Sequence, residues 1–188
     1  IRYPMENFIG VWWSGSENDV LPAGDKATGY KALAFHAVNS DFPIFDDIQK
    51  FVVDRGKAAG AGDQIGTVLY NRGMYNAMLI TEAARTAQAI AGKSNISQAD
   101  MIKGFEALEM TEEKMAALGL PGFGPSFSVS CENHGGDGMV AVAQWDAGAG
   151  KWSIVSDFQA SDMSVIQPLI DADSGAFASE NNLSPNCN

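Results

Sequence analysis

The sequence predicts an α/β fold, and three observations lead to this prediction. Short apolar runs that suit buried strands occur early in the chain, beginning with Phe8–Gly15, which reads Phe-Ile-Gly-Val-Trp-Trp-Ser-Gly. Longer stretches with a helical apolar period come between and after such runs. A hairpin pattern then occupies part of the last third. Strands that alternate with helices are typical of layered α/β proteins.

The first apolar run is expected to contain a buried parallel strand, because three apolar residues surround Gly10 between turn-forming residues. In open α/β sheets, ligands bind beyond the carboxyl ends of the strands, which is where Trp12, Trp13 and Ser14 stand. Side chains alternate along a strand, so we expect the two indoles to point to opposite sides, one packed and one facing a cleft. Burial of either indole in the core is the competing interpretation.

The elements that follow are predicted from apolar period and helix caps. We expect strands at 30–38 and 67–70, helices at 41–56, 71–91 and 98–109, and a short helix after residue 111. Ser97 and Asp100 form a capping-box pattern, and Thr111 can serve as an N-cap. Gly56–Gly66 is a glycine-rich connection, and Leu120–Pro125 is a Gly/Pro break.

The last third is predicted to form a hairpin and a helical tail. Met139–Trp145 and Trp152–Phe158 flank Asp146–Gly150, which predicts two antiparallel strands with a glycine-bearing loop. Helical segments are expected at 162–170 and 175–182. A chain of 188 residues is long enough for one domain or for two small lobes.

Composition and charge argue against two classes of function. Hydrophobic residues make up 46% and charged residues 19%, which is ordinary for a globular protein. The net charge of −11, with 12 scattered Lys and Arg residues, argues against nucleic acid as a partner. The sequence contains no apolar run of the length that spans a bilayer.

The two cysteines, Cys131 and Cys187, are either buried thiols or one disulfide. Cys187 stands next to the last residue, an unusual place for a buried thiol, so the pattern favours a disulfide and an oxidising compartment. No metal site is expected, because there is no Cys-x-x-Cys pair and only His36 and His134 could add imidazoles. Both histidines are better explained as structural residues, one at a strand end and one in a turn.

Motifs for cofactor binding and catalysis are incomplete. Gly92-Lys93-Ser94 lacks the preceding glycine of a phosphate-binding loop, since Ala87 occupies that position. Ser14-Gly15-Ser16 lacks the spacing of a nucleophile elbow. We therefore predict a binding protein rather than an enzyme, and no cofactor.

Several segments in the same order resemble one family, the type I periplasmic substrate-binding proteins of ABC importers, in the group that binds branched-chain amino acids. The matching segments cover nearly the whole chain and are Phe8–Gly15, Gly29-Tyr30-Lys31, Met74-Tyr75-Asn76-Ala77, Glu82-Ala83-Ala84, Gly124-Pro125-Ser126-Phe127, Glu132-Asn133-His134-Gly135, Gln144-Trp145 and Lys151-Trp152. The ordered set is more specific than any one of its members.

The resemblance implies the periplasmic-binding-protein type I fold, in which two Rossmann-like lobes are joined by hinge crossings and close over a ligand. It implies that this chain is the C-terminal half only, with the N-terminal half of the same protein as a partner. Residues 1–66 would be the latter part of lobe two, 67–137 a returning segment of lobe one, and 138–188 the final crossing and C-terminal segment of lobe two.

The implied function is solute capture in the periplasm, with delivery to an ABC permease in the inner membrane. A signal peptide would have been removed before this sequence begins. The ligand-binding residues would be Trp12, Trp13 and Ser14, with Tyr70, Asn71 and Tyr75 near the hinge.

The ligand implied by the resemblance is a small amino acid or an organic acid. The glutamate that holds the ligand ammonium in the classical amino acid binders has no clear match here, and the aligned strand end reads Trp12-Trp13-Ser14. Two indoles could stack on an aromatic carboxylate instead. A ligand-sensing domain of the same fold and a self-contained doubly wound enzyme domain are the alternative functions.

Overall fold

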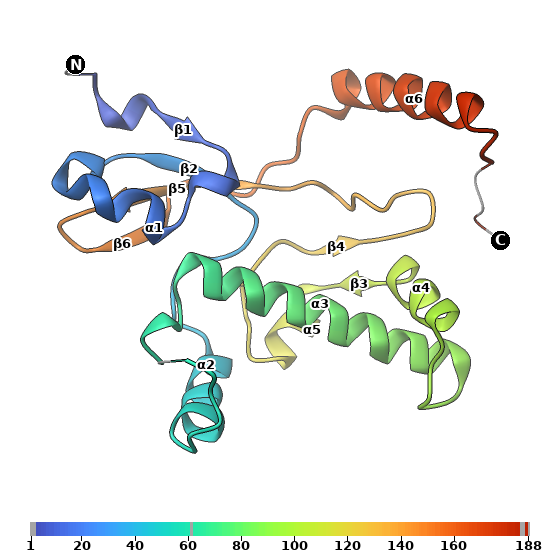
Figure 1. Ribbon diagram of the computed structural model, residues 1–188, viewed down its shortest axis with the longest axis horizontal. Coiled ribbons are helices and arrows are strands. Elements are labelled where there is room, and N and C mark those ends of the chain that lie inside the picture. The colour runs from blue at the N-terminus through green and yellow to red at the C-terminus, as the bar shows by residue number, and fades with distance from the viewer. Residues whose placement is uncertain (1–2, 61, 185–186, 188) are drawn as a thin grey trace.

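The computed structural model describes residues 3–60, 62–184 and 187, and it has a mixed α/β architecture (Figure 1). The strands are β1 (Ile9–Gly10), β2 (Lys31–Ala34), β3 (Glu109–Met110), β4 (Phe127–Ser128), β5 (Ala141–Asp146) and β6 (Lys151–Ile154). The helices are α1 (Glu17–Val20), α2 (Pro43–Ile48), α3 (Val68–Ala91), α4 (Gln98–Glu106), α5 (Glu112–Ala117) and α6 (Met163–Glu180).

One sheet of four strands organises the first of two buried clusters. Its order is β1-β2-β5-β6, with β1 parallel to β2 and the other pairs antiparallel. The hairpin of β5 and β6 places Trp145 opposite Trp152, which confirms the predicted hairpin. The cluster, here called the sheet core, consists of Val20, Ala27, Ala32, Ala34, Val38, Val68, Ala143, Trp145 and Trp152.

The second buried cluster lies among α2, α3, α5 and the short β3–β4 pair. It is here called the helix core and consists of Ala37, Phe42, Phe45, Met78, Leu108, Met110, Met115, Leu120 and Phe123. Helix α4 lies close against α3 at Gly104, where an added Cβ would meet the backbone oxygen and the side chain of residues on α3. The predicted caps of α4 and α5 are confirmed, since Ser97 and Thr111 accept from backbone N–H groups in each first turn.

The first turn of α3 joins the two cores. Thr67 caps the helix by accepting from the Tyr70 N–H, and the Glu17 carboxylate accepts from the Val68 N–H at 3.1 Å. Val68 belongs to the sheet core, whereas Met78, further along the same helix, belongs to the helix core. The strand predicted at 67–70 is therefore wrong. The β-branched and aromatic residues there suit a strand, but the cap residue and a distant carboxylate together start a helix.

The predicted strand near Gly10 exists and is parallel, but its predicted burial is wrong. Strand β1 has only two residues and lies at the edge of the sheet, and Ile9 is 60% exposed. The prediction that Trp12 and Trp13 point to opposite sides is also wrong. The chain leaves the extended conformation after β1 and forms a 3₁₀ turn at Trp12–Ser14, where the alternation of a strand no longer applies.

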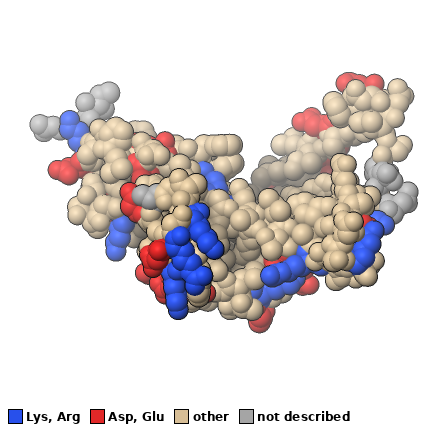
Figure 2. Space-filling model, turned by 60° about the horizontal axis from the view of Figure 1, so that its bottom comes forward, with Lys and Arg blue, Asp and Glu red and all other residues tan. Residues whose placement is uncertain are grey.

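The tail forms one helix rather than the two predicted segments. Helix α6 continues through Gly175, because a single glycine in a helix costs only about 1 kcal/mol. It stands apart from the rest of the chain in Figure 1 and exposes six large apolar side chains. Figure 2 shows a hollow beside it whose walls are mostly uncharged side chains. In the part of the chain that the structure describes, none of the helices has the length and hydropathy needed to cross a membrane.

The two cores draw on several stretches of the chain. Phe42 and Phe45 pack in the helix core, which follows the sheet-core residue Val38 in the chain. The last sheet-core residues are on β5 and β6. The predicted first segment also contains residues 1, 2 and 61, which lie outside the described residues.

Candidate functional site

Two stacked indoles stand where β1 ends, at the point that the sequence indicates for a ligand. The ring centroids of Trp12 and Trp13 are 4.0 Å apart with an angle of 26° between the ring planes. Trp12 is half-buried, whereas Trp13 is 72% exposed. An exposed indole held by a second indole is a preformed apolar platform, because little side-chain freedom is left to lose when a planar ring stacks on it.

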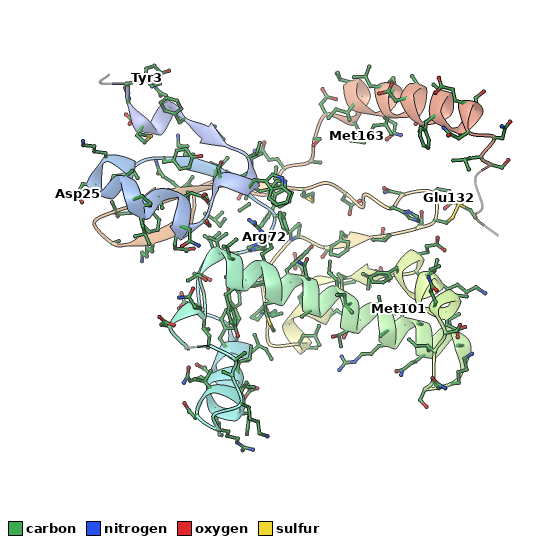
Figure 3. The ribbon with its side chains drawn as sticks, viewed as in Figure 1. Tyr3, Asp25, Arg72, Met101, Glu132 and Met163 are labelled. Atoms are coloured by element: carbon green, nitrogen blue, oxygen red, sulfur yellow. A yellow bond between two sulfur atoms is a disulfide. The ribbon has the colours of Figure 1, made fainter. Side chains whose placement is uncertain are left out.

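Arg72, from the first turns of α3, lies beside this platform (Figure 3). Its guanidinium carbon is 5.0 Å from the centroid of the Trp12 ring and 5.6 Å from that of Phe35. Its Nη2 donates to the Trp12 carbonyl oxygen at 2.9 Å, while its Nε is buried without a hydrogen-bond partner among the described residues. Burial lowers the pKa of Arg72, and Asp19 opposes this shift. A guanidinium is the side-chain group that suits a carboxylate best, because its N–H groups can bind both carboxylate oxygens.

Four more aromatic rings continue the platform toward α3 and the helix core. Phe35 lies edge-on to Trp12 at 5.6 Å and to Tyr75 at the same distance, and His36 stacks on Phe123 at 5.8 Å. Burial raises the pKa of Tyr75 to about 12 and lowers the pKa of His36 to about 4. Both side chains are therefore neutral at physiological pH.

Two of these rings, Phe35 and Tyr75, line a cavity of about 270 Å³ between α3 and the loops around β4. A turn-rich segment that includes His134 and Asp137 also lines it. The remaining lining residues are Leu79, Pro125, Ser126, Phe127, Val129, Gly135, Gly136, Gly138 and Met139. A space of this volume suits a small molecule such as an amino acid or a benzoate.

The structure brings together three of the six predicted ligand-binding residues, Trp12, Trp13 and Tyr75, with Phe35 between them. Ser14 does not join them. Its hydroxyl lies 2.9 Å from the Tyr30 hydroxyl and donates to the Val11 carbonyl oxygen at 3.0 Å, which closes the 3₁₀ turn.

Asn71 and Tyr70 also lie apart from the indoles. Asn71 is fully buried, and its amide donates to the carbonyl oxygens of Ala37 and Asn39, where it holds the segment that crosses between the two cores. Tyr70 packs against Phe45 at 5.9 Å, on the side of the helix core. In this structure both side chains support the fold around the platform.

Sequence reasoning missed Phe35 and Arg72. A signal for Arg72 exists, because residues three apart share one face of a helix, and Arg72 stands three residues before Tyr75. Both residues lie within the helix predicted at 71–91, so their shared face could have been read from the sequence. Phe35 follows β2 directly, and a strand end is again where ligands are contacted.

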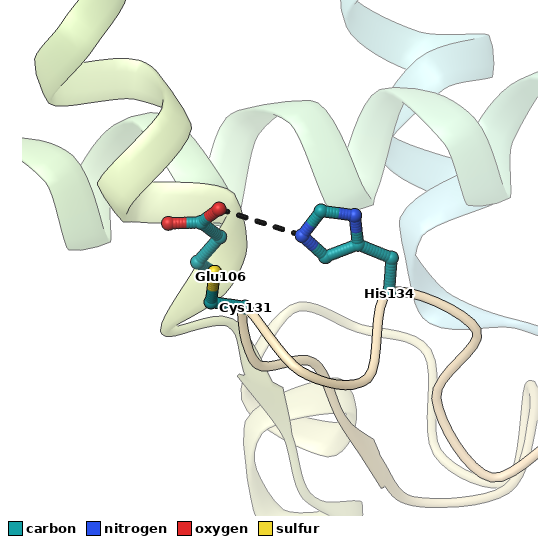
Figure 4. Close-up of side chains that lie close together, drawn as sticks. All are labelled: Glu106, Cys131 and His134. Carbon is teal, nitrogen blue, oxygen red and sulfur yellow. Dashed lines mark hydrogen bonds and ion pairs between the residues drawn. The ribbon is translucent and has the colours of Figure 1, made fainter. Parts of the chain in front are cut away.

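The predicted disulfide is confirmed, since Cys131 is bonded to Cys187 across a sequence separation of 56 residues. Near it, His134 Nε2 lies 3.4 Å from Glu106 Oε1 (Figure 4). These three groups are the described residues that could hold a metal ion, with ligand atoms within 4.8 Å of one another. In the disulfide state only the carboxylate and the imidazole are suitable ligands, because a metal binds the thiolate form of cysteine.

Two of the solved structures that resemble this chain are both named as parts of ABC transporters. One is titled an ABC transporter permease from the Pseudomonas fluorescens group. It has a TM-score of 0.90 and 35% sequence identity, and the match covers 100% of this chain and 45% of that one. The other is titled a branched-chain amino acid ABC transporter from Thermus thermophilus with bound valine. It has a TM-score of 0.59 and 20% identity, over 82% of this chain and 39% of that one.

Protein-family models and curated proteins gave no match. The chain spans less than half the length of the two structures that it resembles. The structural likeness shows that the chain has the α/β fold of the periplasmic-binding-protein type I class, as the sequence predicts, over part of that fold.

Proposed function

We propose that this chain is part of a solute-binding protein of an ABC importer, and that it captures a small organic acid between two lobes. The observation on which this depends is the exposed indole platform with the guanidinium of Arg72 beside it, 5.0 Å from the centroid of the Trp12 ring. The titles of both similar structures name ABC transporter components, and one of them holds valine. The role is binding, with delivery to a permease in the inner membrane, rather than catalysis.

The ligand that best fits the platform is an aromatic carboxylate. A ring would stack on Trp13, and the carboxylate would bind the guanidinium of Arg72. A branched-chain amino acid is the alternative, and it is favoured by the valine in the Thermus structure. An amino acid brings an ammonium group that needs an acidic partner. Asp137, which lines the cavity, would supply that carboxylate.

The proposal includes the N-terminal half of the same protein as a partner that completes both lobes. The apolar side chains of α6 and two side chains of α4, Ile102 and Phe105, are exposed in this chain. Burial of each such side chain contributes about 1.5–3 kcal/mol. We propose the three-segment division of the lobes, with residues 1–66 as the latter part of lobe two, 67–137 as a returning segment of lobe one, and 138–188 as the final crossing and C-terminal segment of lobe two.

An extracytoplasmic location is part of the proposal. The disulfide between Cys131 and Cys187 supports it, because disulfides persist in oxidising compartments. Export can be tested by fractionating cells of the source organism and blotting the periplasmic and cytoplasmic fractions. Recovery only with the cytoplasmic marker would contradict this part of the proposal.

Ligand class can be tested by calorimetry and tryptophan fluorescence with three ligands: benzoate, cyclohexanecarboxylate and valine. Benzoate and cyclohexanecarboxylate have the same charge and similar size, so their difference reports stacking. We expect benzoate to bind most tightly and Trp13→Ala to weaken it about tenfold, since aromatic pairs contribute about 0.5–1.5 kcal/mol beyond area burial. Phe51→Ala, which also truncates an exposed aromatic side chain, is the matched control.

The role of Arg72 needs a separate variant. Arg72→Lys keeps the positive charge but removes the planar donor pair, so benzoate binding should weaken while the fold stays intact. If the protein bound valine more tightly than benzoate, the proposed aromatic ligand would be wrong, whereas the proposed binding role would stand. Failure of all tested acids to bind the protein joined to its N-terminal half, or turnover of any of them, would contradict the binding role itself.

A further inference from the structure

A carboxylate, an imidazole and one sulfur atom converge at the end of α4, and a second sulfur is bonded to the first. Glu106 is the last residue of this helix, and its carboxylate lies within 4.8 Å of the ligand atoms of Cys131 and His134. The sulfur of Cys187 is bonded to that of Cys131 at 2.04 Å. When this disulfide is reduced, Cys187 can supply the fourth donor of a tetrahedral site beside the three groups that converge.

The spacing of the carboxylate and the imidazole suits a metal better than it suits a hydrogen bond. His134 Nε2 and Glu106 Oε1 are 3.4 Å apart, which is long for a charge-assisted hydrogen bond. Two ligands held by zinc at about 2.0–2.1 Å in tetrahedral geometry stand about 3.3 Å apart. The two side chains thus already lie at the separation that coordination to one ion requires.

The loop that supplies two of the donors is fixed by its own hydrogen bonds. Ser130 and Asn133 bond to each other through their backbones, and the Asn133 side chain donates to the Gly136 carbonyl oxygen at 3.1 Å. The loop is joined to the end of α4 because the Val129 N–H donates to the Leu108 carbonyl oxygen at 2.9 Å. Donor positions that are fixed before binding reduce the entropy lost when an ion binds.

Electrostatics at this point also favour a cation. The C-terminal end of a helix carries partial negative charge, which disfavours a carboxylate such as Glu106 and favours a positive ion. The carboxylate side chain is 26% exposed and the imidazole 68% exposed, so an ion can enter from solvent.

We propose that the reduced form of this protein binds one zinc ion through Cys131, Cys187, His134 and Glu106, and that the disulfide and the ion exclude each other. A dithiol reductant converts the disulfide to two thiols and is itself oxidised to its own disulfide. The zinc ion then binds both sulfurs as thiolates, and two protons are released to solvent. Disulfide and metal are thus two alternative ways to tie the C-terminal tail to the 130–136 loop.

Cobalt(II) is a suitable probe, because its visible bands report tetrahedral geometry and its near-ultraviolet charge transfer reports thiolate ligands. The protein is reduced with dithiothreitol, freed of reductant under nitrogen, and titrated with Co²⁺, with the oxidised protein titrated alongside. We expect one tetrahedral Co²⁺ per reduced protein, its displacement by Zn²⁺, and no thiolate charge transfer in the oxidised protein.

The Co²⁺ affinities of variants distinguish a four-ligand site from metal binding by the two thiols alone. His134→Ala and Glu106→Gln should each weaken Co²⁺ binding at least about tenfold, the lower limit for the loss of groups that merely orient ligands. Glu109→Gln removes an exposed carboxylate three residues from Glu106 and should leave binding unchanged. Absence of Co²⁺ binding by the reduced protein would overturn the proposal. If His134→Ala and Glu106→Gln bound Co²⁺ as tightly as Glu109→Gln, the proposal would be overturned as well. This holds whether or not reduction unfolds the protein.

Discussion

Acid should destabilise this protein through His36, the most deeply buried titratable side chain of the aromatic cluster. The imidazole is 1% exposed, and its Nδ1 lies 2.8 Å from the Ala37 carbonyl oxygen. A carbonyl only accepts, so Nδ1 carries the proton of the neutral ring and Nε2 is left as an acceptor. Nε2 has no hydrogen-bond partner among the described residues. A proton added there would place a charge among Phe35, Tyr75 and Phe123.

The size of the effect follows from the pKa in the two states. Burial lowers the pKa of His36 from 6.5 in the unfolded chain to about 4 in the folded one. Above pH 6.5 the ring is neutral in both the folded and the unfolded state, so the free energy of unfolding does not depend on the titration of His36 there. As the pH falls from 6.5 toward 4, the unfolded state binds the proton first, so the free energy of unfolding decreases by about 1.4 kcal/mol per pH unit. The total loss attributable to His36 is about 3 kcal/mol.

The assay is urea denaturation at several pH values between 4 and 7.5, followed by tryptophan fluorescence. Carboxylates also titrate in this range, so the decisive quantity is the difference between the wild-type protein and His36→Phe at each pH. The variant should lose the contribution of His36 to the slope, whereas His134→Ala, at an exposed histidine, should keep it. Parallel pH profiles for wild type and His36→Phe would refute the reasoning.

Three further predictions concern stability, and each can be checked by urea denaturation at neutral pH. Gly104→Ala should destabilise the protein by about 1–3 kcal/mol, because the new methyl would meet the Ala83 carbonyl oxygen. Gly73→Ala, on the open surface of α3, should not destabilise it. An equal effect of both substitutions would show that close packing is not the cause. Ser97→Ala should cost about 1 kcal/mol through loss of the α4 cap, and an unchanged midpoint would argue against that cap. Replacing both Cys131 and Cys187 by Ser should cost about 4 kcal/mol on the chain-entropy account for a loop of 56 residues, and a loss below about 1 kcal/mol would contradict it.

Local signals predicted the elements whose cause lies within a few residues. The caps at Ser97 and Thr111, the hairpin around Trp145 and Trp152, and the long helix ending at Gly92 all have such causes. The start of α3 could not be predicted in this way. Its first N–H is satisfied by the carboxylate of Glu17, which stands 51 residues earlier in the chain.

The arrangement of the candidate site could not be predicted from the sequence. The sequence shows that two tryptophans follow a strand, yet the 3₁₀ turn that stacks Trp12 on Trp13 has no clear local signal. Arg72 reaches Trp12 from a helix 60 residues further along, so their pairing depends on how the sheet and α3 meet. Tertiary contacts of this kind are outside the range of periodicity and capping rules.

Three hydrogen bonds fix the first turn of α3 to distant parts of the chain, since Glu17, Trp12 and Ala37 all bond to its residues 68–72. The helix has 24 residues and is about 36 Å long. If the helix rotated by about 10° about this turn, its far end would move by about 6 Å. The indoles beside the turn would then hardly move, while α4 and the disulfide loop near the far end would move by several ångströms.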